Sequence, residues 1–306
     1  MSIDRFTGVL APVITPFDKQ LNPDSRRLIA HCHWLLSQGV NLAVFGTNSE
    51  ANSLSVDERN QLLDALVEAG IDPARMMPGT GCCALTDSVH LTRQAVRLGC
   101  RGVLMLPPFY YKGVSDDGLF AFYSEVIQRV GDSALQLYLY HIPPIAQVPL
   151  SLNLIDRLVA AYPETVAGIK DSSGDWQNTQ ALLNAGWENF RVFCGSESFL
   201  LATMQGGGAG CISATANVNP APIRQLWENW QQEDAAERQQ ALDLCRAFFQ
   251  GFPMIAALKA TLAYTAQDPE WTRVRPPLSA LTEQQQAELV SGLRNLDFQM
   301  PGLPAG

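Results

Sequence analysis

Lysine is scarce in this sequence. Only Lys19, Lys112, Lys170 and Lys259 are present, against seventeen arginines, and the formal net charge of −9 comes with no basic block. Proteins that bind nucleic acid concentrate positive charge on one surface, so this charge balance argues against that function class. Because positive surface charge is left mostly to arginine, each lysine is a candidate for a specialised role.

Long apolar runs are also missing. No run is long enough to span a bilayer, so we expect no membrane segment. Residues 1–5 lack a basic segment followed by an apolar one, which predicts no secretory signal. Seven cysteines without regular spacing are typical of reduced thiols. Together these features predict a cytoplasmic protein.

What the chain does contain is a repeated alternation of short apolar runs and longer segments of helical period. Of its 306 residues 47% are hydrophobic and 17% charged, enough for a large core. The expected strands are 8–15, 40–45, 76–80, 102–106, 135–140, 166–170, 192–195 and 210–213. The expected helices between them are 24–37, 56–68, 87–98, 117–130, 152–161, 176–184 and 199–205. Most of the strands lack polar alternation, as in parallel strands buried on both faces.

Eight such units predict an α/β fold, a (β/α)₈ TIM barrel over residues 1–225. Three further helical stretches, 234–250, 254–266 and 282–295, predict a C-terminal helical extension over 226–306 that belongs to the same domain. Ser55 to Glu58 and Thr282 to Gln285 have the spacing of a capping box, which places a helix start at each.

Lys170 ends an apolar, β-capable run, Val166 to Lys170, and small polar residues follow it at once. A lysine at the mouth of a buried strand must be paired, desolvated or reactive, because burying a bare ammonium is costly. From this stretch alone, an amine that forms an imine with a carbonyl substrate and a salt-bridged structural lysine are both open interpretations.

The C-terminal ends of barrel strands face the active site, so the other candidates are read from those ends. The turn Gly46-Thr47-Asn48-Ser49-Glu50 could hold a carboxylate on its backbone N–H groups, or could be a simple polar turn. Alternation in residues 135–140 places Tyr138 and Tyr140 in the barrel interior. A phenol beside an amine can relay protons, although a rim tyrosine with no chemical role has the same pattern.

Metal and cofactor chemistry have little support. His31 and His33 lie two apart on an expected helix and therefore point to different faces, His90 lies on another helix, and only His141 is near the mouth. One histidine does not make a zinc or iron site, so no metal is expected. The glycine run 206–210 precedes the last strand instead of following it, which argues against a phosphate-bearing cofactor there. We expect no cofactor.

With these strand ends aligned, nearly the whole chain resembles the dihydrodipicolinate synthase / N-acetylneuraminate lyase superfamily of class I, Schiff-base-forming aldolases. Six motifs, whose order and spacing together are specific, carry the resemblance. They are Gly8 to Phe17, Gly46-Thr47-x-x-Glu50, Pro107 to Tyr110, Tyr140-x-Ile142-Pro143 and Gly168-Ile169-Lys170-Asp171, followed by Ile212 to Asn217 at the last strand.

The resemblance implies roles for individual residues. Lys170 would form the imine with pyruvate or a longer 2-oxo acid, Tyr140 would be the acid/base group, and Thr47 and Asn48 would bind the carboxylate. Tyr110 looks like the tyrosine that tetrameric synthases lend across a dimer interface, and Tyr111 beside it is the alternative match. A homotetramer, a dimer of dimers, follows from the resemblance alone.

The remaining strand ends supply further candidates of two kinds. Gly195 and Ile212 are expected to contact the substrate. Five positions are expected to set specificity: His141, Ile145, Ser172, Ser196 and Glu197.

Three departures from the family pattern bear on the substrate. Asn48 and Ser49 replace the hydroxyl residue and the glycine of the usual turn. His141 stands where the synthases have Asn. Ile145 stands where they have an Arg for the semialdehyde carboxylate, and loss of that guanidinium removes bidentate binding.

The departures favour a 2-oxo-acid aldolase or lyase. The alternatives are dihydrodipicolinate synthase itself, a 2-keto-3-deoxy sugar-acid dehydratase, and a non-catalytic 2-oxo-acid sensor that kept the barrel but lost turnover.

Overall fold

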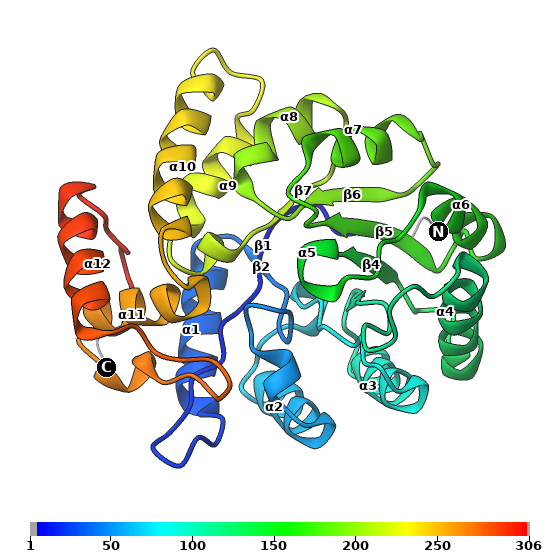
Figure 1. The fold of residues 1–306 in the computed structure, drawn as a ribbon, viewed down its shortest axis with the longest axis horizontal. Coiled ribbons are helices and arrows are strands. Elements are labelled where there is room, and N and C mark those ends of the chain that lie inside the picture. Colours follow the sequence, from blue (N-terminus) through cyan, green and yellow to red (C-terminus); the bar gives the residue numbers. More distant parts are fainter. Residues whose placement is uncertain (1–4, 305–306) are drawn as a thin grey trace.

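The computed structural model describes residues 5–304 as a ring of parallel strands surrounded by helices, with further helices on one side (Figure 1). The strands are β1 (Gly8–Ala11), β2 (Asn41–Leu42), β3 (Val103–Met105), β4 (Leu137–His141), β5 (Val166–Asp171), β6 (Arg191–Cys194) and β7 (Gly210–Ile212). They pair in the order β2-β1-β7-β6-β5-β4-β3, and every pair is parallel.

The third expected strand, 76–80, is recognisable only as two isolated parallel bridges. Leu42 pairs with Met76, and Gly79 pairs with Leu104. These bridges join the two edge strands β2 and β3 through one extended segment, so the sheet closes on itself. Pro78 has no N–H to donate, which is one reason why regular pairing is lost here. The predicted TIM-barrel architecture is confirmed.

The helices lie close to their expected ranges. They are α1 (Ser25–Ser37), α2 (Val56–Glu68), α3 (Leu85–Arg97), α4 (Asp116–Val130), α5 (Pro143–Ala146), α6 (Leu152–Ala161), α7 (Trp176–Asn184), α8 (Leu200–Gln205), α9 (Pro220–Glu228), α10 (Ala235–Gln250), α11 (Met254–Ala266) and α12 (Glu283–Asn295). Both predicted capping boxes, at Ser55 and Thr282, are present. The expected helices did not include the short α5 or α9, and the expected boundary at residue 225 falls inside α9, whose first turn holds two prolines.

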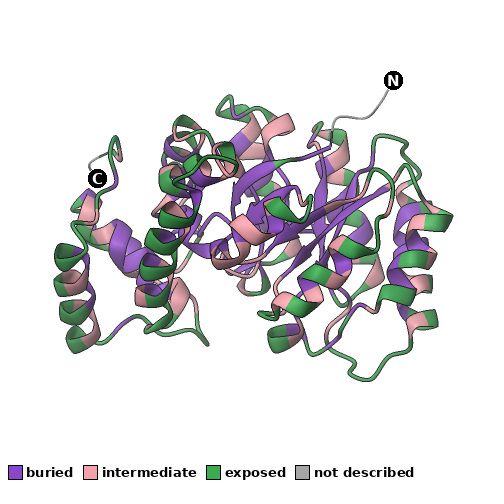
Figure 2. Cartoon of the chain, turned by 90° about the horizontal axis from the view of Figure 1, so that it is seen from above, coloured by how far each residue is buried: buried purple, intermediate pink, exposed green. Residues whose placement is uncertain are grey.

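Alternation along β4 separates the two layers of the core. Tyr138 and Tyr140 point into the barrel, where they pack with Leu104, Phe193 and other inward residues. The leucines at 135, 137 and 139 belong instead to the larger cluster between sheet and helices. Figure 2 shows the consequence, with buried strands at the centre and helices that are exposed only on their outer faces. The sequence prediction that the tyrosines face the interior is confirmed.

The N-terminal side of the barrel is closed by polar contacts that do not reach the opposite rim. The Phe6 N–H donates to the Tyr138 hydroxyl at 2.9 Å, and Arg5 Nε donates to Gln136 Oε1 at 3.2 Å. At the β7–β1 seam, a Cβ on Gly210 would lie 1.9 Å from the Gly8 carbonyl oxygen, so only glycine allows these two strands to meet. The glycine run that ends at Gly210 therefore has a packing role.

Two of the predictions from the sequence concern a membrane segment and a secretory signal. Within residues 5–304 no single helix has the length and apolarity to cross a membrane; α10 and α11 meet that criterion only as a pair, bent by 105°. Most of residues 1–5, from which we expect no secretory signal, lie outside the described part of the chain.

Candidate active site

Lys170, Tyr140 and Thr47 come together at the C-terminal ends of the strands. Lys170 and Tyr140 are paired positions on β5 and β4, and both side chains are buried. The Lys170 Nζ atom donates to the Tyr140 hydroxyl at 3.2 Å and lies 4.3 Å from the centroid of its ring. The same hydroxyl is 3.2 Å from Thr47 Oγ1, on the turn after β2. An amine, a phenol and an alcohol thus form one continuous hydrogen-bonded chain.

This geometry distinguishes the two interpretations of Lys170. A salt-bridged structural lysine needs a carboxylate within reach, but in the described chain Lys170 forms no ion pair. Its hydrogen-bond partner is the phenol of Tyr140. A buried amine held by a phenol is suited to attack a carbonyl carbon.

The turn 46–50 offers backbone donors to a ligand. Ser49 replaces the family's glycine without strain, because its hydroxyl accepts from the Gly46 N–H at 3.1 Å and the left-handed conformation falls on Glu50 instead. The backbone hydrogen bonds of the turn start from Ser49, Glu50 and Ala51, so across residues 5–304 the N–H groups of Thr47 and Asn48 have no protein acceptor. Two adjacent free N–H groups can hold a carboxylate.

Gly195 and Ser172 meet at the rim between β5 and β6. The Gly195 N–H donates to the Asp171 carbonyl at 2.6 Å, and a Cβ on Gly195 would lie 2.1 Å from Ser172 Oγ. Ile212 ends β7 with its side chain in the barrel interior. The structure therefore places all three at the same rim as Lys170, and their contacts with substrate stay a prediction.

His141 is a buried, neutral wall residue. Its Nδ1 accepts from the Leu150 N–H at 3.0 Å, so any proton on the neutral ring is on Nε2. Burial lowers its pKa, an effect that the carboxylate of Asp171 partly offsets. Ile145, two residues into α5, is by contrast 62% exposed.

Ser196 and Glu197 have roles in the fold that the sequence did not show. Ser196 caps a short 3-10 helix by accepting from the Ser198 N–H at 3.3 Å. Glu197 is fully buried, with its carboxylate bonded by the hydroxyls of Ser213 and Thr215 and lying 3.5 Å from Arg246 Nη1. Both carboxylate oxygens of Glu197 already accept hydrogen bonds from this chain. A role of Glu197 in specificity stays a prediction.

Tyr110 is not brought to the other three residues. It is 74% exposed and packs edge-to-face on Tyr111, which is 72% exposed, with ring centroids 5.3 Å apart. Lys112, at the end of the same loop, donates to the carbonyls of Phe109 and, at 2.8 Å, Ala146, which ties the loop to α5. Within one chain the Tyr110 hydroxyl has no partner among residues 5–304.

Sequence reasoning missed two buried groups behind the site. Asp171 accepts hydrogen bonds from Ser173 and Thr179 and so fixes the loop after Lys170. Glu50, known only as part of a motif, pairs with Lys259 of α11, and burial lowers the pKa of that lysine to about 8 against the opposing effect of the carboxylate. The sequence signal for this ion pair was Lys259, a lysine inside the otherwise apolar stretch of α11.

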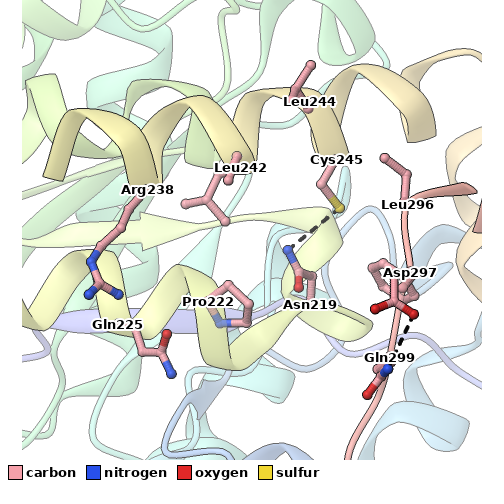
Figure 3. A pocket seen from close by; sticks show the side chains of 12 residues that line it. Asn219, Pro222, Gln225, Arg238, Leu242, Leu244, Cys245, Leu296, Asp297 and Gln299 are labelled. Atoms are coloured by element: carbon pink, nitrogen blue, oxygen red, sulfur yellow. Dashed lines mark hydrogen bonds between the residues drawn. The ribbon is translucent and has the colours of Figure 1, made fainter. Parts of the chain in front are cut away.

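A separate cavity of about 670 Å³ lies away from these residues, between α9, α10 and the segment after α12 (Figure 3). Several of its polar groups have close neighbours: Asn219 contacts Cys245 Sγ at 3.6 Å, Arg238 pairs with Asp234, and Gln299 bonds Asp297. No set of groups converges on the cavity, so the catalytic candidate remains the strand-end site.

Comparisons with known proteins show the family of the chain. A model of the dihydrodipicolinate synthetase family matches residues 5–296. An uncharacterised DapA-like lyase from Chloroflexus aurantiacus is 33% identical over 285 residues, covering 92% of this chain and 94% of the relative.

Two crystal structures are similar over almost their whole length. One is dihydrodipicolinate synthase from Agrobacterium tumefaciens, with a TM-score of 0.87, 32% identity, and coverage of 95% of this chain and 99% of that one. The other is a prophage protein of the dihydrodipicolinic acid synthase family from E. coli K12 in complex with pyruvate, with a TM-score of 0.88, 26% identity, and coverage of 96% and 99%. The chain belongs to the dihydrodipicolinate synthetase family and is a lyase of that family.

Proposed function

We propose that the enzyme forms an imine between Lys170 and pyruvate, or the 2-oxo group of a longer acid, and uses it to break or make a carbon–carbon bond. The observation that carries this proposal is the hydrogen-bonded chain Lys170–Tyr140–Thr47, in which Lys170 and Tyr140 are buried and each pair of polar atoms is 3.2 Å apart. The pyruvate complex of the similar E. coli K12 protein supports the choice of ligand.

Each group has a chemical task in this scheme. The Lys170 Nζ lone pair attacks the carbonyl carbon, and the free N–H groups of Thr47 and Asn48 hold the adjacent carboxylate. Tyr140 gives its proton to the departing hydroxyl, which leaves as water, and the protonated imine then accepts the electron pair of the bond that breaks. In the direction of condensation the same electron pair returns through the enamine to an aldehyde carbon. Thr47 relays a proton from solvent to Tyr140: its oxygen takes a proton from water as it passes its own proton to the phenolate, so that neither group is left charged.

Tyr110 takes part only in an assembly. Its exposed position fits the proposal that a neighbouring subunit of a homotetramer, a dimer of dimers, receives it and completes the proton relay. The seven cysteines are all free thiols, which fits a cytoplasmic enzyme.

Trapping tests the proposal. The protein is incubated with pyruvate and sodium borohydride, digested, and analysed by mass spectrometry. Reduction of the imine attaches a stable adduct to Lys170. Lys259, also buried but paired with a carboxylate, is the internal control and stays unlabelled. Absence of the adduct on Lys170 overturns the proposal.

Dihydrodipicolinate synthase itself is the second candidate, favoured by the 32% identity to the Agrobacterium tumefaciens synthase. Condensation of pyruvate with aspartate semialdehyde decides between the two. Release of pyruvate from a panel of 2-keto-3-deoxy acids identifies the partner of a lyase, and loss of water from the same acids identifies a dehydratase. Pyruvate binding without exchange of its methyl protons identifies a non-catalytic sensor.

A further inference from the structure

The turn that carries Thr47 is attached to the C-terminal helices by a fully buried ion pair. Glu50 and Lys259 have no exposed side-chain surface, and Lys259 Nζ bonds Glu50 Oε1 directly. The other carboxylate oxygen, Oε2, accepts from the Arg275 N–H at 2.9 Å. Lys259 also donates to the Arg273 carbonyl at 2.6 Å. Both carboxylate oxygens of Glu50 are therefore held by residues 259–275.

The attachment is reinforced around Phe17, which is completely buried. Lys259 Nζ lies 4.5 Å, and the Arg275 guanidinium 4.9 Å, from the centroid of the Phe17 ring. Arg275 also donates to the Ser53 carbonyl at 2.6 Å and pairs with Glu58, both just beyond the turn. Arg275 thus bonds the segment 50–58 at three residues, Glu50, Ser53 and Glu58.

A short path leads from Glu50 to the site. The Glu50 N–H donates to the Thr47 carbonyl at 3.1 Å, and Thr47 Oγ1 contacts the Tyr140 hydroxyl. Glu50 has φ of 55°, a left-handed conformation that a non-glycine residue keeps only where its surroundings fix it. The Glu50 side chain is fixed because Lys259 and the Arg275 backbone N–H bind it.

A contribution to stability is a weak explanation for the buried Glu50–Lys259 ion pair. Two charges taken out of water lose hydration that their attraction barely restores, and an apolar pair of the same volume is often as stable. Placement of the turn is a better reason, since a shift of about 1 Å in a catalytic group can lower a rate by about a hundredfold.

We infer that Glu50 and Lys259 are positioning residues, through which the C-terminal helices set Thr47 against Tyr140. The inference rests on the proposed function, in which Thr47 and Tyr140 form the proton relay. It makes the helical extension part of the catalytic apparatus, although none of its described side chains bonds Lys170, Tyr140 or Thr47.

The test removes both charges together. Glu50→Gln/Lys259→Met keeps the side-chain volumes and an oxygen for the Arg275 N–H. We expect a thermal midpoint close to that of the wild type, but exchange of pyruvate methyl protons into D₂O slowed by about tenfold or more. We also expect faster amide hydrogen exchange, measured by mass spectrometry, in the peptide covering residues 46–53.

A matched control is available in Arg27 and Asp268, which also join the barrel to the extension, with Arg27 Nε 2.6 Å from Asp268 Oδ2. Arg27→Met/Asp268→Asn should leave both readouts within about twofold of the wild type, because that pair does not touch the turn. An equal slowing in the control overturns the inference.

A double-mutant cycle separates positioning from a general structural effect. In a Thr47→Val background, loss of the Glu50–Lys259 pair should slow pyruvate exchange no further, because its effect passes through Thr47. An undiminished, multiplicative effect overturns the inference. If the double variant does not fold, Glu50→Asp, which keeps both charges but withdraws the carboxylate by one methylene, carries the same expectations.

The inference can be separated from the proposed function. If the wild type itself neither forms the adduct nor exchanges pyruvate protons, the proposed function fails, and the amide exchange of residues 46–53 decides alone. Unchanged protection in the charge-free variant then overturns the positioning role, and lost protection supports it.

Discussion

Tyr140 and Lys170 are directly paired across two neighbouring parallel strands, β4 and β5, and their polar atoms are 3.2 Å apart. Strand register therefore fixes the distance between phenol and amine. A slip of one residue would turn either side chain toward the helices, since alternate residues face opposite sides of a strand. The proposed imine chemistry depends on this register.

Removing the Tyr140 hydroxyl should slow the reaction strongly without unfolding the barrel. Tyr140→Phe breaks the path between Lys170 and Thr47, and loss of a general acid–base group typically costs about 10²–10⁴-fold in rate. Exchange of pyruvate methyl protons in D₂O, followed by NMR, measures this.

Tyr138→Phe is the matched control for that change. Tyr138 faces the same interior two residues earlier, but its hydroxyl accepts from the Phe6 N–H at the opposite end of the barrel. We expect about 1 kcal/mol of lost stability and a rate near that of the wild type. Similar rates for the two variants would contradict the role of Tyr140.

Gly195 should not tolerate a methyl group. A Cβ there would lie 2.7 Å from the Asp171 carbonyl oxygen, which belongs to the strand that carries Lys170 and cannot move aside. Gly195→Ala should cost about 1–3 kcal/mol and lower activity, as overpacking does. Urea unfolding measures the first effect. Gly118→Ala, where the nearest atom is Ser115 Oγ at an ordinary 3.6 Å, is the control and should lose neither.

Local patterns were sufficient to predict much of the barrel and the central pair. The run that ends at Lys170 and the alternation that points Tyr140 inward are both properties of short segments, and parallel strands bring their ends to one rim. The segment 76–80 was only partly predictable, because its apolar residues read as a strand while Pro78 limits its hydrogen bonds.

Contacts between distant elements could not be predicted in the same way. Glu50 and Lys259 are 209 residues apart, and no local pattern shows which face of an apolar helix will meet which turn. The same holds for Glu197, whose place at a strand end suggested a ligand to substrate. Its carboxylate is satisfied by Ser213 and Thr215, which only the folded chain brings together.

Ile145 should make the enzyme a poor dihydrodipicolinate synthase. Its side chain is 62% exposed on α5, so an arginine fits there without repacking. A fixed guanidinium adds charge-assisted hydrogen bonds to a carboxylate, so Ile145→Arg should raise kcat/KM for aspartate semialdehyde by about tenfold or more. Coupled assay of the condensation measures this.

Ile145→Lys separates geometry from charge. It supplies the same charge without the planar fork, so its gain should be smaller than that of Ile145→Arg. Robust condensation by the wild-type enzyme would instead defeat the argument from Ile145.

His31 should make the protein less stable in mild acid. The ring is fully buried between Trp34 and Trp271, and burial lowers its pKa from 6.5 to about 4. Between pH 4 and 6.5, His31 binds a proton in the unfolded chain but not in the folded chain. The free energy of unfolding therefore falls as the pH drops from about 6.5 to 4, by about 3 kcal/mol for this group. Carboxylates titrate in the same range, so the comparison is with His31→Gln, measured by urea unfolding at several pH values. The variant should lose this part of the pH dependence, and equal slopes in the two proteins would show that His31 is protonated in the folded state.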